Sequence, residues 1–130
     1  MKKMMIMSPG LPKIFRLFFY IFIFYPNLCL SEPIKNKTAI LNLLDKTANK
    51  VSKRFIDINT SENWGSLNIY IYACYSNPPD EIPENYVLLD VIDQINEKKE
   101  SIYKGWMISS SPNVTPLEHP VYDLWLDDCE

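Results

Sequence analysis

The single histidine of the chain lies in the run Glu118-His119-Pro120-Val121-Tyr122-Asp123. An imidazole beside carboxylates is a pattern used in general acid–base catalysis, with the histidine as base and an acid that orients it. Pro120 favours extended backbone at His119, however, so the neighbouring side chain of Glu118 points to the opposite face. Asp123 reaches His119 only through a turn at Pro120. We therefore expect Glu118 and His119 to anchor this loop through bonds to backbone groups, and catalysis centred on His119 is the less favoured hypothesis.

Other catalytic and cofactor patterns are missing from the sequence. There is no G-x-S-x-G nucleophile motif, and the run Ser109-Ser110-Ser111 is expected to cap a loop. One histidine is too few for the usual zinc sites, and the acidic pairs Asp80-Glu81 and Asp127-Asp128 lack the spacing of a calcium loop. After the first 31 residues only Gly65 and Gly105 remain, which excludes a glycine-rich phosphate cradle. We predict a non-enzymatic protein without metal or cofactor.

Aromatic side chains are the second candidate for function. Trp64, Trp106, Trp125 and the tyrosines are numerous for a small domain. If exposed, such rings form a binding surface or line a ligand pocket, and if buried they fill a core. Trp125 alternates with leucines on both sides, so we expect it in the core. Trp106 follows Gly105 and is the better candidate for a partly exposed contact.

The first 31 residues predict a secretion signal. Lys2, Lys3, Lys13 and Arg16 precede the apolar run Leu17–Tyr25, and Cys29-Leu30-Ser31 offers small residues before a cut that would leave Glu32–Glu130 as the domain. The apolar run has nine residues, whereas a membrane span needs about 20. The alternatives are an uncleaved signal that anchors the chain in the membrane and, less favoured, lipidation of Cys29.

Charge and cysteine content agree with an exported domain. Without the leader, nine basic residues face sixteen acidic ones, a net charge of −7. So acidic a domain repels phosphate backbones, and we expect no nucleic-acid partner. Cys74 and Cys129 are the two cysteines of the domain, and an even pair in a small secreted domain favours one disulfide. Redox and metal roles are less favoured, because a CxxC spacing and further metal ligands are missing.

Strand patterns dominate the domain. Six segments rich in β-branched and aromatic residues alternate with turn-forming residues; they are Thr38–Leu44, Val51–Ile58, Leu67–Tyr75, Tyr86–Ile92, Ile102–Ile108 and Val121–Leu126. The first two segments predict a hairpin. We predict an all-β domain, a small antiparallel sandwich or barrel of about six strands.

Three details of these strands can be predicted. In Leu67–Tyr75, one face carries Leu67, Ile69, Ile71 and Ala73 and the other carries Tyr70, Tyr72 and Cys74, so we expect a central strand covered on both faces. Three prolines exclude a helix or an inner strand from Asn77–Asn85. Gly105 inside a strand predicts a bulge or a close backbone approach.

Several short motifs together resemble a known family. They are Lys37-Thr38-Ala39, Leu44-Asp45-Lys46, Gly65-Ser66-Leu67, Cys74 before Pro78-Pro79, Gly105-Trp106-Met107, Ser111-Pro112, the run EHPVYD, Trp125 and Cys129. In this order they resemble DUF2155, a family of exported alphaproteobacterial proteins whose biochemical function is not established. The resemblance covers nearly the whole domain, implies a bacterial periplasmic address and a Cys74–Cys129 pair, and transfers no catalytic residue.

These observations favour a non-enzymatic periplasmic protein that binds or scaffolds an unidentified partner of the cell envelope. We expect its interaction surface to draw on the loop Asn77–Asn85 and the segment Glu118–Tyr122. A small-ligand carrier is the alternative, and it requires an apolar pocket beside Trp106. An enzyme centred on His119 ranks below both.

Overall fold

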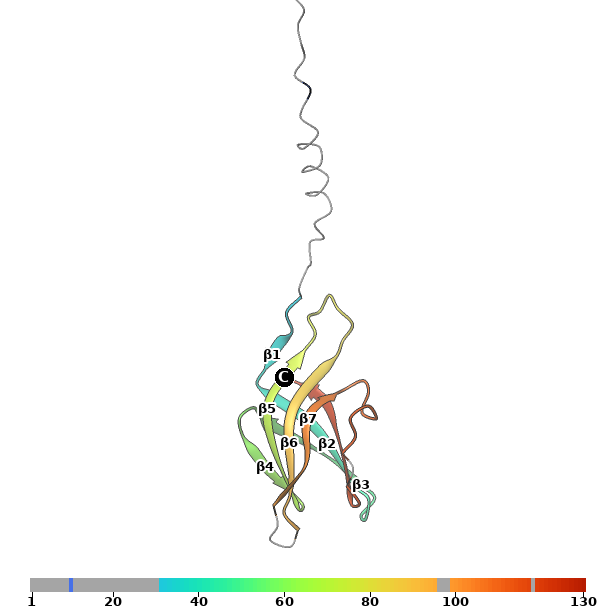
Figure 1. The fold of residues 1–130 in the computed structure, drawn as a ribbon. Helices are drawn as coiled ribbons and strands as arrows, with labels where there is room; N and C mark the ends of the chain where they lie inside the picture. The colour runs from blue at the N-terminus through green and yellow to red at the C-terminus, as the bar shows by residue number, and fades with distance from the viewer. Residues whose placement is uncertain (1–9, 11–30, 96–98, 118) are drawn as a thin grey trace, which may run out of the picture. The chain divides into compact units, whose positions relative to one another are not determined.

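The computed structural model describes residue 10 and residues 31–95, 99–117 and 119–130 (Figure 1). The predicted leader, apart from Gly10 and Ser31, lies outside these residues, as does Glu118. Across the described ranges no helix has the length and apolar character needed to cross a membrane. Residues 31–130 form one compact unit, and the account below concerns that unit.

The domain is built from β-strands, as predicted. The strands are β1 (Ile34–Asn36), β2 (Thr38–Asp45), β3 (Lys50–Asp57), β4 (Ser61–Trp64), β5 (Leu67–Ser76), β6 (Asn85–Asp93), β7 (Glu100–Ile108) and β8 (Tyr122–Cys129). The prediction of about six strands missed β1 and β4. Both are short strands at the edge of β5, and their mostly polar sequences carry no alternation that would signal them.

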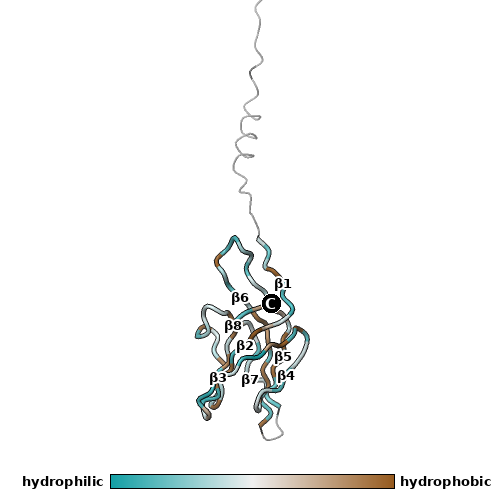
Figure 2. The backbone as a smooth tube through the Cα atoms, turned by 180° about the vertical axis from the view of Figure 1, so that it is seen from behind, coloured by the Kyte–Doolittle hydropathy of each residue, from teal (hydrophilic) through white to brown (hydrophobic). Residues whose placement is uncertain are grey.

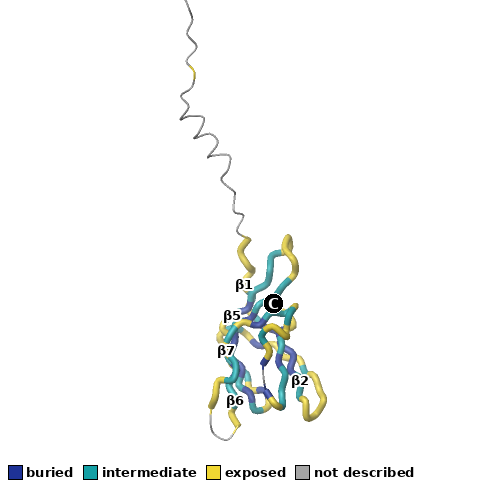
Figure 3. The backbone as a smooth tube through the Cα atoms, turned by 45° about the vertical axis from the view of Figure 1, so that its right-hand side comes forward, coloured by how far each residue is buried: buried dark blue, intermediate teal, exposed yellow. Residues whose placement is uncertain are grey.

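The strands form a two-layer antiparallel sandwich, which confirms the predicted class. In the larger sheet the order is β1-β5-β6-β7, and β4 pairs with β5 beside β1. In the smaller sheet the order is β3-β2-β8, so the predicted hairpin, β2–β3, forms with its turn at residues 46–49. One apolar core lies between the sheets, and Figures 2 and 3 show the hydrophobic and buried stretches along the strands.

A disulfide joins the two sheets. Cys74 of β5 pairs with Cys129 of β8, with 5.8 Å between their Cα atoms. Both cysteines are buried in the core. The predicted disulfide is therefore present, and its cysteines lie 55 residues apart in the sequence, with β6 and β7 between them.

The predicted faces of β5 are wrong beyond Ile71. The pairing with β6 shifts register between Ile71 and Ala73, so one extra residue is inserted at Tyr72. An inserted residue reverses which side chains point inward. As a result Cys74 is fully buried on the core face, while Tyr72 is 37% exposed on the outer face, which is not covered.

Two further predictions from β7 and β8 need correction. Gly105 pairs with Leu89 in regular register, so the predicted bulge at Gly105 is wrong; the ring of Tyr103 lies over it instead. Trp125 is not in the core. Its neighbours Leu124 and Leu126 both point inward, and the two-residue period of a strand therefore turns Trp125 to the outer face.

The two ends of the sandwich carry different segments. The long loop 77–84 between β5 and β6 lies beside β1 at one end, which we call the loop end (Figure 1). At the hairpin end, Lys46 of the β2–β3 turn donates its backbone N–H to Val121 just before β8. Residues 119–122 thus lie at the hairpin end and the loop 77–84 at the other, so these two segments of the expected interaction surface do not form one continuous patch.

Candidate functional site

An open groove lies at the loop end beside Trp106, and we call it the Trp106 groove. Its volume is about 400 Å³, and it is lined by Ser31, Pro33, Tyr75, Asn77, Pro78, Glu81, Tyr86 and Trp106. The walls are mostly aromatic and proline rings. The predicted partly exposed contact at Trp106 therefore lies in a concave apolar site, which is the feature that ligand binding requires.

Neighbouring strands of the larger sheet position the aromatic wall. Tyr75 of β5 lies directly opposite Tyr86 of β6. Trp106 of β7 comes within 6.1 Å of Tyr75, measured between ring centroids, with the two ring planes tilted by 39°. Trp106 is 44% exposed, and its backbone oxygen accepts a hydrogen bond of 2.7 Å from the Tyr103 hydroxyl. Rigid strands thus present the rings to solvent.

Hydrogen bonds within the loop 77–84 shape the rim of the groove. Asn77 donates its backbone N–H to Glu84 O at 2.9 Å, and its side-chain amide donates to Ile82 O at 2.8 Å. The Glu81 N–H donates to Pro78 O at 3.0 Å. The loop therefore has a defined path, and its residue Ile82 is 84% exposed.

Glu84 holds the end of this loop against the end of β7. Its carboxylate accepts hydrogen bonds from the Ser109 hydroxyl at 2.8 Å, from the Ser110 N–H at 3.0 Å and from the Ser110 hydroxyl. Partial burial disfavours the charge of Glu84, but these bonds and one from the Asn85 N–H outweigh it, so the pKa of Glu84 lies below its ordinary value. The serine run thus caps this loop, as predicted.

The electrostatics of the groove differ from those of the surrounding sheet. Among the described residues, Glu81 takes part in no ion pair. On the same outer face, Lys104 lies 5.4 Å from the centre of the Tyr72 ring and 3.7 Å from Asp90. The neighbouring aromatic–acidic pair is thus neutralised by the chain itself, whereas the groove keeps an uncompensated carboxylate.

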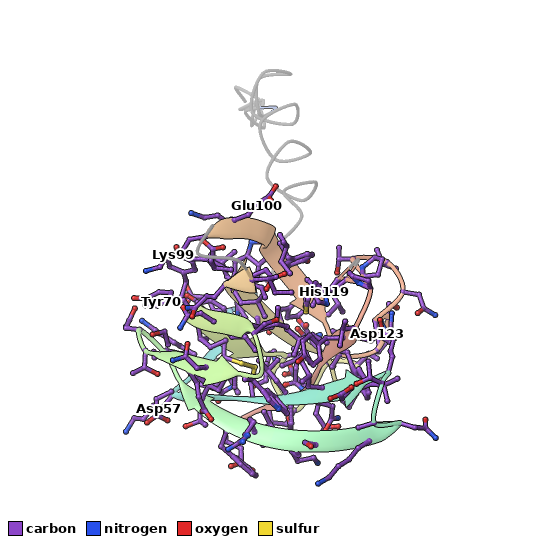
Figure 4. The ribbon with its side chains drawn as sticks, turned by 90° about the horizontal axis from the view of Figure 1, so that it is seen from below. Asp57, Tyr70, Lys99, Glu100, His119 and Asp123 are labelled. Atoms are coloured by element: carbon purple, nitrogen blue, oxygen red, sulfur yellow. A yellow bond between two sulfur atoms is a disulfide. The ribbon has the colours of Figure 1, made fainter. Side chains whose placement is uncertain are left out.

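His119, labelled in Figure 4, lies in the loop before β8 at the hairpin end, and both of its ring nitrogens are engaged. Nδ1 accepts hydrogen bonds from the backbone N–H groups of Val121 at 3.2 Å and Tyr122 at 3.1 Å. Nε2 lies 3.1 Å from Asp93 Oδ2. Because Nδ1 is an acceptor, the neutral ring carries its proton on Nε2 and donates it to Asp93. His119 is 6% exposed and stacks on the ring of Tyr122.

The carboxylate partner of His119 is Asp93, which sequence reasoning missed. Burial disfavours the charge of Asp93, but the hydrogen bond from His119 and further hydrogen bonds outweigh it, so the pKa of Asp93 lies below its ordinary value. Asp123 points elsewhere: it forms an ion pair of 2.6 Å with Lys46, whose ammonium also donates to His119 O. Asp93 ends a strand 26 residues before His119, and no local motif connects the two.

His119, Asp93 and Tyr122 form a cluster at the hairpin end that is suited to fixing the loop before β8. A general base needs a free lone pair toward its substrate, and in His119 the Nδ1 lone pair is shared by two backbone donors. Tyr122 completes the cluster by lying over Gly65 of the β4–β5 turn. Within the described parts of the chain, no three His, Cys, Asp or Glu side chains are grouped as metal ligands.

Comparison with known proteins identifies the family but no activity. The chain is 27% identical over 94 residues to "Uncharacterized protein RP359" of Rickettsia prowazekii (strain Madrid E), and the match covers 72% of this chain and 59% of that relative. No solved structure matches. A family model described as "Uncharacterized protein conserved in bacteria (DUF2155)" matches residues 39–129. Because this match spans well over half of the sequence, including both disulfide cysteines, Trp106 and His119, the chain belongs to the DUF2155 family.

Proposed function

We propose that this protein is a non-enzymatic, exported binding module of the cell envelope, and that the Trp106 groove is its recognition surface. The observation that carries the proposal is an open groove with three aromatic rings on neighbouring strands, beside a hydrogen-bonded loop that exposes the apolar side chain of Ile82. Exposed Trp and Tyr rings are the side chains that most often dominate binding energy at protein surfaces.

The engagement of His119 supports a non-enzymatic role. Its two ring nitrogens bind backbone N–H groups and Asp93, so the ring has no free lone pair to serve as a base. The N-terminal sequence pattern and the disulfide between Cys74 and Cys129 support export to the periplasm, because disulfides persist in oxidising compartments.

Site-specific photo-crosslinking tests the proposal. A diazirine amino acid replaces Ile82, which is exposed and follows the groove residue Glu81 in the sequence, and one in place of Phe55, which is 60% exposed on β3 of the other sheet, is the matched control. In cells that express the full chain, we expect position 82 to form a discrete adduct with an envelope component and position 55 to form none. The substitution Trp106→Ala should abolish the adduct while leaving the protein level unchanged.

Adducts that form equally from both positions, or that persist in Trp106→Ala, would locate binding elsewhere and contradict the proposal. Diazirines insert into lipids and small molecules as well as proteins, so the mass of the adduct also identifies the class of ligand.

A small-ligand carrier is the second candidate, and the volume of the groove favours it. About 400 Å³ is within the range of small-molecule sites. A carrier isolated under native conditions should retain a small molecule, visible by native mass spectrometry as a mass increment that Trp106→Ala removes. The absence of any such increment would favour the binding module.

A further inference from the structure

In the described part of the chain, two cationic side chains each lie near both an aromatic ring and a carboxylate. The Arg54 guanidinium lies 5.4 Å from the centre of the Trp64 ring and pairs with Glu62 at 3.4 Å. The contacts of Lys104 with Tyr72 and Asp90 repeat this arrangement on the outer face of the larger sheet. In both cases the ring face and the anion attract the same cation.

The Trp106 groove has the same two components without a cation. Trp106 and Tyr75 provide adjacent rings, and Glu81 provides a carboxylate on the same groove. Within the described ranges, neither ring is covered by an Arg or Lys side chain, and Glu81 has no cationic partner. Lys35 of β1 lies opposite Tyr75 in register, but in the described part of the chain it forms no cation–π contact with Tyr75 and no ion pair with Glu81. The groove is therefore complementary in charge to a positive group presented from outside.

A segment of another protein suits this groove better than a small molecule. Small-molecule sites usually enclose most of their ligand, whereas this groove is open, and Ile82 extends an apolar surface beyond its rim. Arginine is the preferred cation for such a site, because its planar guanidinium stacks on an indole and pairs with a carboxylate at the same time. The tyrosine and proline rings of the walls suit an extended, proline-flanked backbone.

We propose that the Trp106 groove binds an arginine side chain on an extended segment of a partner protein, with the guanidinium on Trp106 and Tyr75 and paired with Glu81. This inference rests on the proposed binding function and specifies the chemistry of its partner. It also assigns distinct roles to two groove residues: Trp106 supplies stacking, and Glu81 supplies charge.

A pair of isosteric peptides tests the proposal. The probe is acetyl-Pro-Pro-Arg-Pro-Pro-amide, and its control replaces arginine with citrulline, which keeps the planar shape without the charge. The readout is the indole N–H signal of Trp106 in NMR spectra of protein purified from cells that express the full chain. We expect saturable shifts with a Kd of about 1 mM or tighter, and binding of the citrulline peptide weaker by about five-fold or more.

Two matched pairs of variants separate the roles of charge and ring. Glu81→Gln should weaken binding of the arginine peptide by about five-fold and leave binding of the citrulline peptide unchanged. Asp80→Asn removes the same charge one residue away, outside the groove lining, and should change the affinity for either peptide little. Trp106→Leu should abolish binding, whereas Trp125→Leu on the outer face of the smaller sheet should not. For Trp106→Leu, binding is followed by calorimetry.

Equal binding of the two peptides would show an apolar groove without charge recognition and overturn the inference. No binding of the arginine peptide at about 10 mM would do the same, as would a concentration-dependent dimer that Trp106→Leu disrupts, because the occupant would then be a second copy. If crosslinking from position 82 still gives a Trp106-dependent adduct in these cases, only the arginine assignment fails, and the proposed function stands.

Discussion

Nε2 of His119 lies 3.1 Å from Oδ2 of Asp93, and this bond ties the loop before β8 to the end of β6. Asp93 ends β6 of the larger sheet, and His119 lies in the loop that leads into β8 of the smaller sheet. The same ring binds the N–H groups of Val121 and Tyr122 through Nδ1. One side chain thus fixes the entry into β8 and links the sheets at the end remote from the disulfide.

Replacing His119 should therefore lower stability. His119→Gln leaves two partly buried backbone N–H groups and the Asp93 carboxylate without their partner, and we expect the free energy of unfolding to fall by about 2–3 kcal/mol. Urea denaturation followed by fluorescence measures the loss. The control is Asp123→Asn, which breaks the half-exposed ion pair with Lys46 and should cost less than about 1 kcal/mol. Unchanged stability in His119→Gln would contradict the anchoring role.

The tautomer of His119 follows from the same contacts. With two N–H donors directed at Nδ1, the neutral ring must carry its proton on Nε2. Long-range ¹H–¹⁵N NMR correlations distinguish a protonated from an unprotonated ring nitrogen. A neutral ring with the proton on Nδ1 would exclude the hydrogen bonds described and reopen a chemical role for this histidine.

Glu84 should make the stability of the domain depend on pH in the acid range. Its pKa is lower in the folded protein than the ordinary value of 4.5, so the unfolded chain takes up its proton first as the pH falls. The stability that this carboxylate contributes is complete above pH 4.5 and is lost as the pH drops through the lowered pKa of the folded state. Glu84→Gln should therefore reduce the decline in melting temperature between about pH 5 and pH 3. Asp80→Asn, in the same loop, controls for the loss of one negative charge. If the melting temperature of Glu84→Gln still falls as steeply in acid as that of the wild type, the hydrogen bonds to Ser109 and Ser110 do not act as described.

The sequence predicts the class of fold because the signals of a strand are local. β5 and β6 carry buried apolar residues at every second position, β2 is an almost continuous apolar run, and turn residues separate the strands. The disulfide was predictable for a different reason: Cys74 and Cys129 are the two cysteines of the domain in a chain with an export signal pattern.

Departures from regular register could not be predicted. The extra residue near Tyr72 turns Cys74 into the core, and nothing in the local composition marks it, since tyrosine and alanine occur on either face of a strand. The same limit applies to the functional site. Trp106 was recognisable as an unusual residue, but its groove forms only when the loop 77–84 and residues 31–33 come together at one end of the larger sheet. Likewise, the contact of His119 with Asp93 depends on packing between layers.

Loss of the disulfide should destabilise the domain strongly. The bond joins residues 55 positions apart, and for a loop of this length the chain-entropy model gives a contribution of about 4 kcal/mol. We expect the double variant Cys74→Ala/Cys129→Ala to lose most of that amount in urea denaturation, and reductant to lower the stability of the wild-type protein similarly. Reductant should not affect the double variant. Equal stability of the oxidised and reduced proteins would show that the packing between the sheets suffices without the bond.

Gly65 should tolerate no side chain, whereas Gly105 should accept one. Gly65 has a φ of +61°, which L-residues rarely adopt, and a Cβ there would lie 2.8 Å from Cζ of the Tyr122 ring and closer still to its hydroxyl. Gly65→Ala should therefore strain the β4–β5 turn, displace Tyr122 and lower the free energy of unfolding by about 2 kcal/mol or more. At Gly105 a Cβ would meet the Tyr103 hydroxyl oxygen at 3.7 Å, an ordinary contact, so Gly105→Ala should change stability by less than about 1 kcal/mol. The two variants add the same methyl group, so comparing the midpoints of their urea denaturation isolates the effect of position. Equal midpoints would mean that Tyr122 does not lie over the turn.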